Sequence, residues 1–545
     1  MKDIGPTFSL IDEPWIRVLD RGGGQQVVSL LQLLADSHRF RVVVGDLPTQ
    51  ALAILRLSLA VLHRATDGPA SERQWRDLWQ RETLPAEEID GYLREHRDRF
   101  DLLHPVTPFY QVADLRTAKD EPAGLERLLG DVPNGVPYLS ARLGADLLRI
   151  TPAEAARWLV HCQAFDTSGI KSGAVGDPRV KGGKGYPIGP GWCGALGGVF
   201  LEGSSLRDTL LLNLLPESFA HVHRGDDDAP AWERAPLGPA EEDVRERGPY
   251  GPLSLYTWQS RRVRLFGDGR AITGALIANG DKLDPADKHR VEPMTAWRRS
   301  ETREKELKRT PVYLPSRHDP GRALWRGLEV LLPATRGAGA ARLAPAVAEW
   351  LASLRVSGSI AADTRVTLHA VGAVYGTQQS VVEQTIEDAL TMPVQAFHPD
   401  AALRTLIVDG AADAEAAVRH VRTLGANLTR AAGARGDAPT HAGAVAAGSA
   451  FALLDQRFRA WLATLLPDTD PLPARRDWQH IVKRALLTLG SSLVAQAGPA
   501  AWAGRETGGD RSQFLCSSLA DLWFRRGLTK TLPLAVAAPS QEVPA

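Results

Sequence analysis

The residue pattern of this chain changes near residue 398, and that change constrains the fold more than any other feature. Beyond it, Leu, Ala and aromatic residues recur at helical spacing over 399–429, 451–465, 474–493 and 515–522. This spacing places apolar side chains along one face of each helix. Four such helices, with a Gly- and Ala-rich linker over 431–440, predict an up-and-down four-helix bundle.

Residues 1–398 follow a different pattern, in which strand-like and helix-like stretches are interrupted by many Gly and Pro residues. Thr49 is positioned to cap a helix in which Leu residues recur from Leu52 to Leu62. Strands are expected over 15–19, 198–201, 253–258, 263–266 and 366–370. We therefore expect an α+β protein, with a large irregular mixed domain over residues 1–398 followed by a four-helix bundle over residues 399–545.

The composition restricts the classes of protein to which the chain can belong. Its 545 residues are 44% hydrophobic, which is enough for several domains to bury their own cores. Apolar stretches stop well short of about 18 residues, and the start lacks the apolar segment of a signal peptide, so we expect a cytoplasmic protein without membrane contacts. The three Cys residues form no CxxC pair, which argues against a disulfide framework or a Cys-rich zinc site. Because 64 basic residues balance 64 acidic ones, any surface for nucleic acid must be local.

The densest run of Gly lies over residues 169–198, with four Lys and Arg residues between its first Gly and Gly185. Gly lets backbone N–H groups approach a phosphate or a groove wall, and the cations supply counter-charge. The run is not a P-loop, because Lys184 is followed by Gly185 where Ser or Thr is required. A G-x-G-x-x-G at 189–194 precedes a strand-like run, which argues against a dinucleotide site. A plain flexible loop, a loop that reads nucleic acid through its backbone and a nucleotide site stay open.

A second charged segment covers residues 288–309 and mixes basic with acidic residues. Arg298 and Arg299 directly follow Trp297. Arg can contact phosphates and base edges, so a role in binding nucleic acid is one interpretation. The other is a solvated helix face on which opposite charges compensate one another.

A polar turn covers Tyr375 to Ser380, between an expected strand and a helix that we expect to begin near Val381. Its amide side chains, Gln378 and Gln379, can donate and accept hydrogen bonds toward base edges. They can equally cap the helix that follows. Both interpretations stay open on the residues alone.

Catalytic and metal-binding patterns find little support in the sequence. His221 and His223 alternate as two residues on one face of a strand would, but no third ligand follows at a suitable spacing. His161 and Cys162 are sequence neighbours and point apart in any regular structure. We therefore expect a protein that is not an enzyme.

Several short motifs follow one another in a specific order along the chain. They are LIDEPWI at 10–16, FDLLHP at 100–105, PFYQ at 108–111, the Gly-rich run, LRDTLLLN at 206–213, the Tyr-x-x-Gln-Gln turn and the helical end. In this order and spacing the chain resembles the CasA family, the large subunit of the type I-E CRISPR surveillance complex, Cascade. The resemblance extends over essentially the whole chain.

The resemblance implies a non-catalytic subunit that docks at the 5′ end of the crRNA, beside the other Cascade subunits. Such a subunit reads the protospacer-adjacent motif (PAM) of double-stranded target DNA mainly through the minor groove. It opens the first base pairs and helps to recruit the effector helicase-nuclease. Two other classes stay open, namely an interaction scaffold that does not read DNA and a phosphate-binding enzyme that uses the Gly-rich run.

The resemblance also implies which residues contact DNA. The family's wedge Gln falls on Gln379, beside Gln378, and its minor-groove cation falls on Arg298 or Arg299. Its glycine loop falls on Gly182, Gly183, Lys184 and Gly185.

A further loop is implied to anchor the subunit to the crRNA and to its neighbours. It falls on residues 135–142, with Tyr138 as a stacking residue and Arg142 at its end. Some members of the family bind zinc through CxxC pairs, which this sequence lacks. We therefore expect neither a metal nor another cofactor.

Overall fold

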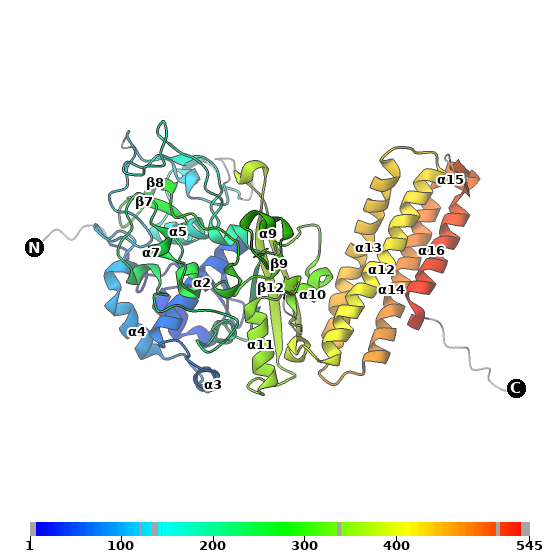
Figure 1. Cartoon of the computed structure of the whole chain (residues 1–545), viewed down its shortest axis with the longest axis horizontal. Coiled ribbons are helices and arrows are strands. Elements are labelled where there is room, and N and C mark those ends of the chain that lie inside the picture. Colours follow the sequence, from blue (N-terminus) through cyan, green and yellow to red (C-terminus); the bar gives the residue numbers. More distant parts are fainter. Residues whose placement is uncertain are drawn as a thin grey trace, which may run out of the picture. The chain divides into compact units, whose positions relative to one another are not determined.

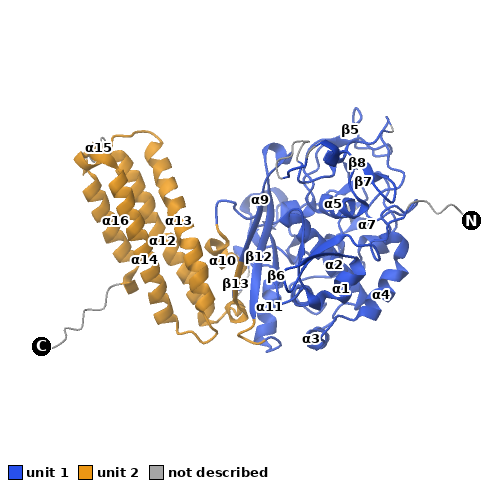
Figure 2. Cartoon of the chain, turned by 180° about the vertical axis from the view of Figure 1, so that it is seen from behind, with its two compact units in different colours: residues 1–322, 333–360, 365–389 blue, residues 323–332, 361–364, 390–545 orange. Residues whose placement is uncertain are grey.

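The chain separates into two compact units in a computed structural model (Figure 2). Unit 1 comprises residues 1–322, 333–360 and 365–389, and unit 2 comprises residues 323–332, 361–364 and 390–545. The sequence suggested one cut, between residues 398 and 399. The structure describes residues 7–119, 121–132, 140–142, 144–334, 339–507 and 513–535.

Helix α2 (Pro48–Ala65) forms the centre of unit 1 and is buried along nearly its whole length. The expected cap, Thr49, is wrong, because the helix begins one residue earlier, at Pro48, and the N-cap Leu47 makes no side-chain hydrogen bond. Pro is suited to this first position, since its missing N–H would have no partner there. Thr49 instead lies inside the unit, where its hydroxyl is 3.0 Å from Nε2 of His161 on α5 (Pro152–Phe165). The remaining helices of this unit are α1 (Leu30–Ala35), α3 (Glu72–Gln80), α4 (Ala86–Glu95), α6 (Leu206–Leu212), α7 (Val244–Arg247), α8 (Pro252–Tyr256), α9 (Glu301–Leu307) and α11 (Ala346–Val356).

Small sheets replace a single large one in this unit, with strand orders β2-β1-β3, β13-β12-β6 and β10-β9-β11 and the pairs β4-β5 and β7-β8. The strands expected near 15–19, 198–201, 263–266 and 366–370 are confirmed as β1, β6, β7 and β12. Long loops connect these elements, as the cyan and green ribbon in Figure 1 shows. The bounds are β1 (Ile16–Asp20), β2 (Gln25–Val28), β3 (Phe40–Val44), β4 (Lys171–Ser172), β5 (Lys184–Gly185), β6 (Gly198–Glu202), β7 (Arg261–Gly267), β8 (Ile272–Asn279), β9 (Trp297–Arg299), β10 (Tyr313–Pro315), β11 (Arg342–Leu343), β12 (Arg365–Tyr375) and β13 (Val382–Pro393).

The strand expected over 253–258 is wrong, because this stretch contains the short helix α8. Pro252 stands at the first helical position, where it fits a helix start. The buried carboxylate of Asp228 accepts hydrogen bonds from the N–H groups of Leu253 (3.1 Å) and Ser254 (2.8 Å). A carboxylate from 24 residues upstream of Pro252 thus satisfies the free N–H groups of the first turn, which no local pattern reveals.

The helix expected near Val381 is also wrong, because strand β13 begins at Val382. The turn over Tyr375 to Ser380 therefore connects two neighbouring strands, β12 and β13, through a short 3₁₀ turn at Thr377–Gln379. Val and Ile residues in this stretch favour a strand, since branching at Cβ restricts their side chains in helices. Because no α-helix follows the turn, the interpretation of Gln378 and Gln379 as helix caps is wrong.

Unit 2 is a bundle of long helices, as expected, but the linker expected over 431–440 is too long, because α12 ends at Ala431 and α13 already begins at Ala438. Figure 1 shows α12 (Ala402–Ala431), α13 (Ala438–Thr464), α14 (Pro471–Gln496) and α16 (Ser517–Thr531) side by side. Its core includes stacked aromatic rings, with Trp461 and Trp478 5.2 Å apart between ring centroids. The short elements are α10 (Leu328–Leu331), α15 (Gly498–Ala503), β14 (Arg505–Thr507) and β15 (Gln513–Leu515).

Residues 323–332 belong to this second unit although they precede the bundle by about 70 residues. Trp325 is fully buried, and its ring stacks on Phe458 of α13 with centroids 4.8 Å apart. Its indole N–H donates to Asp455 over 3.0 Å. One side chain from the irregular part of the sequence thus completes the core of the bundle. No helix in the described part of the chain is long and apolar enough to span a bilayer.

Candidate nucleic-acid interface

The Gly-rich run forms a tight hairpin at its centre. The N–H of Lys181 donates to the C=O of Lys184 and the N–H of Lys184 donates back to Lys181, each over 3.1 Å. The two residues between them, Gly182 and Gly183, have φ angles of 57° and 72°. Two successive residues at positive φ are typical of the type I′ turn that closes two-residue hairpins. A Cβ atom at either Gly would meet nothing within 4 Å, so the tip of this hairpin is open.

The other two residues of the expected glycine loop have different surroundings. Lys184 is exposed at the start of β5, and Gly185 is buried. Gly185 pairs with Lys171 of β4, and a Cβ atom there would approach the side-chain nitrogen of Asn279 to 2.9 Å. Gly185 therefore allows the hairpin to pack on β8, whereas Gly182 and Gly183 provide its turn.

The Gln turn has an unusual backbone. Gln378 and Gln379 have φ angles of 55° and 57°, a region that residues with a Cβ atom rarely adopt. Backbones of this kind cost on the order of 1–3 kcal/mol each and are concentrated at functional sites. Gln378 is exposed, and Gln379 is half-buried. The backbone of both Gln residues is therefore constrained at the tip of a strand-to-strand turn.

The structure brings the Gln turn against the start of the Gly-rich segment. The C=O of Gln379 accepts a hydrogen bond of 2.7 Å from the N–H of Ser168. Gln379 also lines a cavity of about 770 Å³ together with Gly189, Trp192, Arg303 and Arg317. Gln379 and residues that flank the predicted glycine loop thus share one site, although the bond between Ser168 and Gln379 joins positions 211 residues apart.

Arg298 and Arg299 lie on strand β9, where successive side chains point to opposite faces. Arg299 is held by Glu304, with 2.5 Å between Nε and Oε1, and by the hydroxyl of Thr310 at 2.9 Å. The side chain of Arg298 is exposed and forms no hydrogen bond or ion pair with any residue that the structure describes, although its backbone lies in the sheet opposite Leu314 and Arg342. The Arg298 side chain is therefore the one available to an external anion.

The two residues expected to dock crRNA and neighbouring subunits differ in what can be said of them. Tyr138 lies outside the described residues. Arg142 is largely buried and forms ion pairs with Asp131 at 2.8 Å and Glu154 at 2.5 Å. Its guanidinium therefore serves contacts within unit 1, between residues near the expected docking loop and the first turn of α5.

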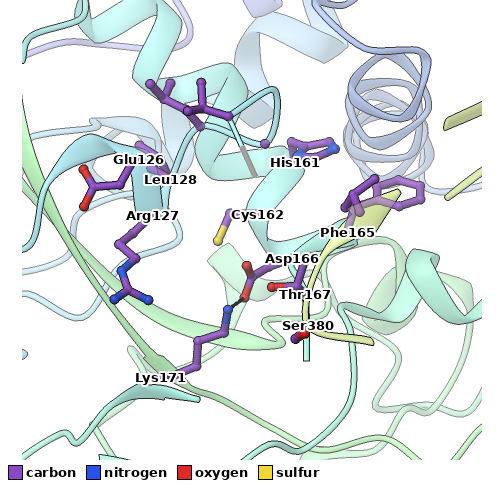
Figure 3. Close-up of a pocket in the computed structure, with 14 residues that line it drawn as sticks. Glu126, Arg127, Leu128, His161, Cys162, Phe165, Asp166, Thr167, Lys171 and Ser380 are labelled. Carbon is purple, nitrogen blue, oxygen red and sulfur yellow. Dashed lines mark ion pairs between the residues drawn. The ribbon is translucent and has the colours of Figure 1, made fainter. Parts of the chain in front are cut away.

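A second cavity, of about 300 Å³, lies beside the C-terminal end of α5 and contains the groups that most resemble catalytic ones (Figure 3). Burial lowers the pKa of His161 to about 4 and raises the pKa of the Cys162 thiol well above its usual value. At neutral pH the imidazole is uncharged and the sulfur is a thiol, the less reactive form. His161 and Cys162 are therefore suited to packing, and among the described residues no group of three His, Cys, Asp or Glu residues is arranged to hold a metal ion.

Sequence reasoning missed the residues that join the two regions, namely Asp166, Ser168 and Arg261. Asp166 is the C-cap of α5, and Arg261 begins β7. The helix end is visible in the sequence as the last apolar position before Asp166-Thr167-Ser168. Nothing local indicates that Arg261, 95 residues later, pairs with that carboxylate.

Comparisons with known proteins agree on one family. The family model described as "CRISPR-associated protein Cse1 (CRISPR_cse1)" matches residues 9–489. A CRISPR-associated protein CasA/Cse1 of Thermus thermophilus is 34% identical over 342 residues. That match spans 62% of this chain and 62% of the relative.

Two solved structures extend the likeness to nearly the whole chain. The crystal structure of Thermobifida fusca Cse1 is 45% identical, with a TM-score of 0.90, and the match covers 97% of this chain and 99% of that one. A chain of a CRISPR RNA-guided surveillance complex has a TM-score of 0.68 at 16% identity, covering 96% of this chain and 99% of that one. The second likeness shows a shared fold.

Proposed function

Because the chain belongs to the CRISPR-associated Cse1 (CasA) family, we propose that it is the large subunit of a type I-E surveillance complex, Cascade. In this proposal it works in the cytoplasm, and its partners are the other Cascade subunits and the crRNA. The fold that it shares with a chain of a CRISPR RNA-guided surveillance complex supports this assignment.

Within that complex the subunit recognises the PAM of double-stranded DNA, mainly through the minor groove. The observation that carries this proposal is the open hairpin tip at Gly182 and Gly183, which is joined through one segment to the turn at Gln379. The minor groove offers a degenerate pattern of donors and acceptors. Backbone N–H groups on a tip without side chains suit that pattern better than a helix in the major groove would. Sequence identification is then left to base pairing with the crRNA, as in other RNA-guided systems.

Arg298 supplies the cation of this interface. Its exposed guanidinium is free of partners in the described part of the chain, and Arg in a narrow minor groove is stabilised by the negative potential there. Arg299, bound to Glu304, holds strand β9 and the following helix together.

Gln379 opens the DNA next to the PAM. Inserting a side chain into a base step costs on the order of a few kcal/mol of stacking, and a rigid wedge spends less binding energy on its own ordering. The constrained backbone at Gln378 and Gln379 supports that role. The subunit itself performs no chemistry, and it helps to recruit the helicase-nuclease that does.

The test compares two targets for the assembled complex, a fully paired PAM-bearing duplex and the same DNA with its first target pairs already open. Gln379→Ala is expected to bind the duplex at least tenfold more weakly and to recover most of that loss on the open target, since ~1.4 kcal/mol corresponds to a factor of ten. One salt concentration is used throughout, because phosphate contacts depend steeply on salt.

Gln378→Ala is the matched control, because the two Gln residues are neighbours with the same backbone conformation. It is expected to bind both targets nearly as the wild type does. If the open target does not rescue Gln379→Ala, Gln379 is not the wedge. If Gln378→Ala alone is rescued, the role belongs to Gln378.

A further inference from the structure

The segment that leaves α5 receives the Gln turn directly. The N–H of Ser168 donates to the C=O of Gln379 over 2.7 Å. At the first residue of the turn, the hydroxyl of Tyr375 donates to the C=O of Phe165, also over 2.7 Å. The turn is thus hydrogen-bonded near both of its ends, at Tyr375 and at Gln379, to residues 165–168, which we name the junction.

The junction also holds the later part of the Gly-rich run. Gly191 donates its N–H to the C=O of Asp166 over 2.8 Å, and the N–H of Gly189 donates to the hydroxyl of Ser168 over 3.2 Å. Arg261, only 1% exposed at its side chain, donates to the C=O groups of Thr167 at 2.7 Å and Gly189 at 2.8 Å. These bonds to backbone groups make the junction rigid on this side.

The link from the junction to the Gly hairpin has a different character. Figure 3 shows Lys171 of β4 facing Asp166, with 2.6 Å between Nζ and the carboxylate. Asp166 also accepts a hydrogen bond from Nε of Arg261. Burial alone would raise the pKa of Asp166. The opposite charges of Lys171 and Arg261 lower it by more than burial raises it, so the pKa lies below its usual value and the group is a carboxylate at neutral pH.

Lys171 and Asp166 line the 300 Å³ cavity together, so the Lys171 stem lacks packing contacts on the side that faces the cavity. A cavity leaves few van der Waals contacts on one side of the stem, so the ion pair determines where the side chain lies. Lys171 is paired along β4 and β5 with Gly185, two residues from the open tip at Gly183. The direction of the Lys171 side chain is therefore coupled to the direction of the hairpin.

We propose that the Lys171–Asp166 ion pair is a positioning device that orients the Gly hairpin relative to the Gln379 turn, so that both reach the same step of the DNA. This inference rests on the proposed function of those two regions. Lys171 is a positioning residue, because its side chain is only 11% exposed and is occupied by Asp166. Its removal affects DNA reading through geometry and not through a lost phosphate contact.

The experiment uses Lys171→Met in the assembled complex, with a library of duplexes randomised beside a fixed target. Preference for the best PAM over unrelated sequences is expected to fall about tenfold, because the charge-assisted bond that orients the hairpin is lost. Lys181→Met is the matched control, since it removes the same charge from an exposed position of the same hairpin. It is expected to weaken all duplexes alike and to reduce the salt dependence.

Three further readouts separate positioning from a loss of folding. Lys171→Arg keeps the ion pair and is expected to restore the PAM preference. Hydrogen exchange of the Gly173 amide, which donates to Gly183, is expected to accelerate in Lys171→Met. Lys171→Met combined with Gln379→Ala is expected to lose little more binding than Gln379→Ala alone, as for residues that act in one unit.

The outcomes distinguish this inference from the proposed function. If the open target restores binding of neither Gln379→Ala nor Gln378→Ala, the proposed function fails whatever the result for Lys171→Met. If Gln379→Ala behaves as expected while Lys171→Met resembles Lys181→Met, or if Lys171→Arg is as damaged as Lys171→Met, the positioning role is overturned. Should Lys171→Met unfold unit 1, Lys171→Gln, which removes the charge and the ion pair but keeps a polar side chain, carries the same comparison, and equal losses on all duplexes overturn the inference.

Discussion

Unit 1 and unit 2 differ in how many polar and charged side chains they bury. Among the described residues of unit 2, the fully buried polar side chains are those of Gln479 and Ser517. Unit 1 buries many more, including several charged ones, among them Arg56, Arg157, Arg207, Asp228, Arg247, Arg261, Arg262, Asp281 and Glu292. Charge inside unit 1 is therefore part of its architecture.

The reason lies in the loops. A long helix satisfies its own backbone hydrogen bonds, whereas a buried irregular segment must find partners elsewhere. In unit 1 these partners are often guanidinium groups. Arg207 donates to the C=O groups of Leu78 and Trp79, and Arg262 donates to those of Gly238 and Ala240. Buried Arg residues thus hold the irregular loops of unit 1, including Arg261 on the segment beside the Gly-rich run, while the bundle is held by apolar packing.

Breaking a buried charge pair in unit 1 is expected to have the largest effect. Arg56 and Glu292 form a two-bond pair at 2.7 and 2.8 Å with side-chain exposures of 2% and 0%. Arg56→Met leaves the buried Glu292 carboxylate without a counter-charge, although the N–H groups of Trp192 and Met294 still donate to it, and is expected to cost about 3–5 kcal/mol of unfolding free energy. Hydrogen exchange measured by mass spectrometry is expected to show the loss in unit 1 peptides only.

The matched control in unit 2 is Arg475→Met, which breaks half-exposed pairs with Asp409 and Asp413. It is expected to cost about 1 kcal/mol or less. Equal costs for the two variants would contradict the idea that buried charge is specific to the architecture of unit 1.

Trp325 tests whether the bundle depends on a residue outside its own stretch of sequence. Trp325→Ala removes a buried ring that stacks on Phe458 and is expected to cost about 3–4 kcal/mol. Hydrogen exchange is expected to accelerate in peptides of α12 and α13, with unit 1 unchanged. Faster exchange in unit 1 alone would contradict the assignment of residues 323–332 to unit 2.

The stability of unit 1 is expected to depend on pH through a buried His. Burial lowers the pKa of His161 in unit 1 from 6.5 to about 4. Between these values the unfolded chain binds a proton and the folded chain does not, so stability present above pH 6.5 is lost as the pH falls toward 4. The loss from this residue is about 3 kcal/mol, since one pKa unit corresponds to 1.36 kcal/mol.

Denaturant unfolding at pH 4.5 and pH 7 measures this effect. His161→Gln does not titrate, and its amide can still bond the hydroxyl of Thr49, so the stability of its unit 1 is expected to vary less with pH. His63 is also buried with a lowered pKa, so part of the dependence remains. Parallel pH profiles for His161→Gln and wild type would contradict the assignment.

The smallest expected effects on stability come from replacing one exposed Gly with Ala in each unit. Gly448→Ala lies on an exposed face of α13 with nothing within 4 Å of the added Cβ, and it is expected to stabilise unit 2 by about 0.5–1 kcal/mol. Gly183→Ala also has free space, but its φ of 72° strains a residue with a Cβ atom, at a cost of about 1 kcal/mol. Thermal unfolding checks both, and effects of the same sign would contradict the comparison.

Local patterns in the sequence were sufficient for the helices of the bundle, whereas the Gly-rich run was predicted as a loop and not as the hairpin that the structure has. The helical spacing over 399–429 predicted a helix that the structure places at Ala402–Ala431. The Gly pair at the hairpin tip is likewise a local signal, because only its own φ angles require Gly. Each of these features depends on residues within a few positions of one another.

The tertiary structure decided the features that depend on distant partners. The turn at Gln379 follows a strand and leads into another strand, and its C=O bonds Ser168, 211 residues earlier. Helix α8 begins where Asp228 caps it, and Arg56 finds Glu292 across 236 positions. The residue types allow many pairings of this kind, and only the packed chain brings one donor within hydrogen-bonding distance of one acceptor. For this protein, local periodicity therefore determined the helices of unit 2, and long-range pairing of buried polar groups determined the proposed DNA-reading site of unit 1.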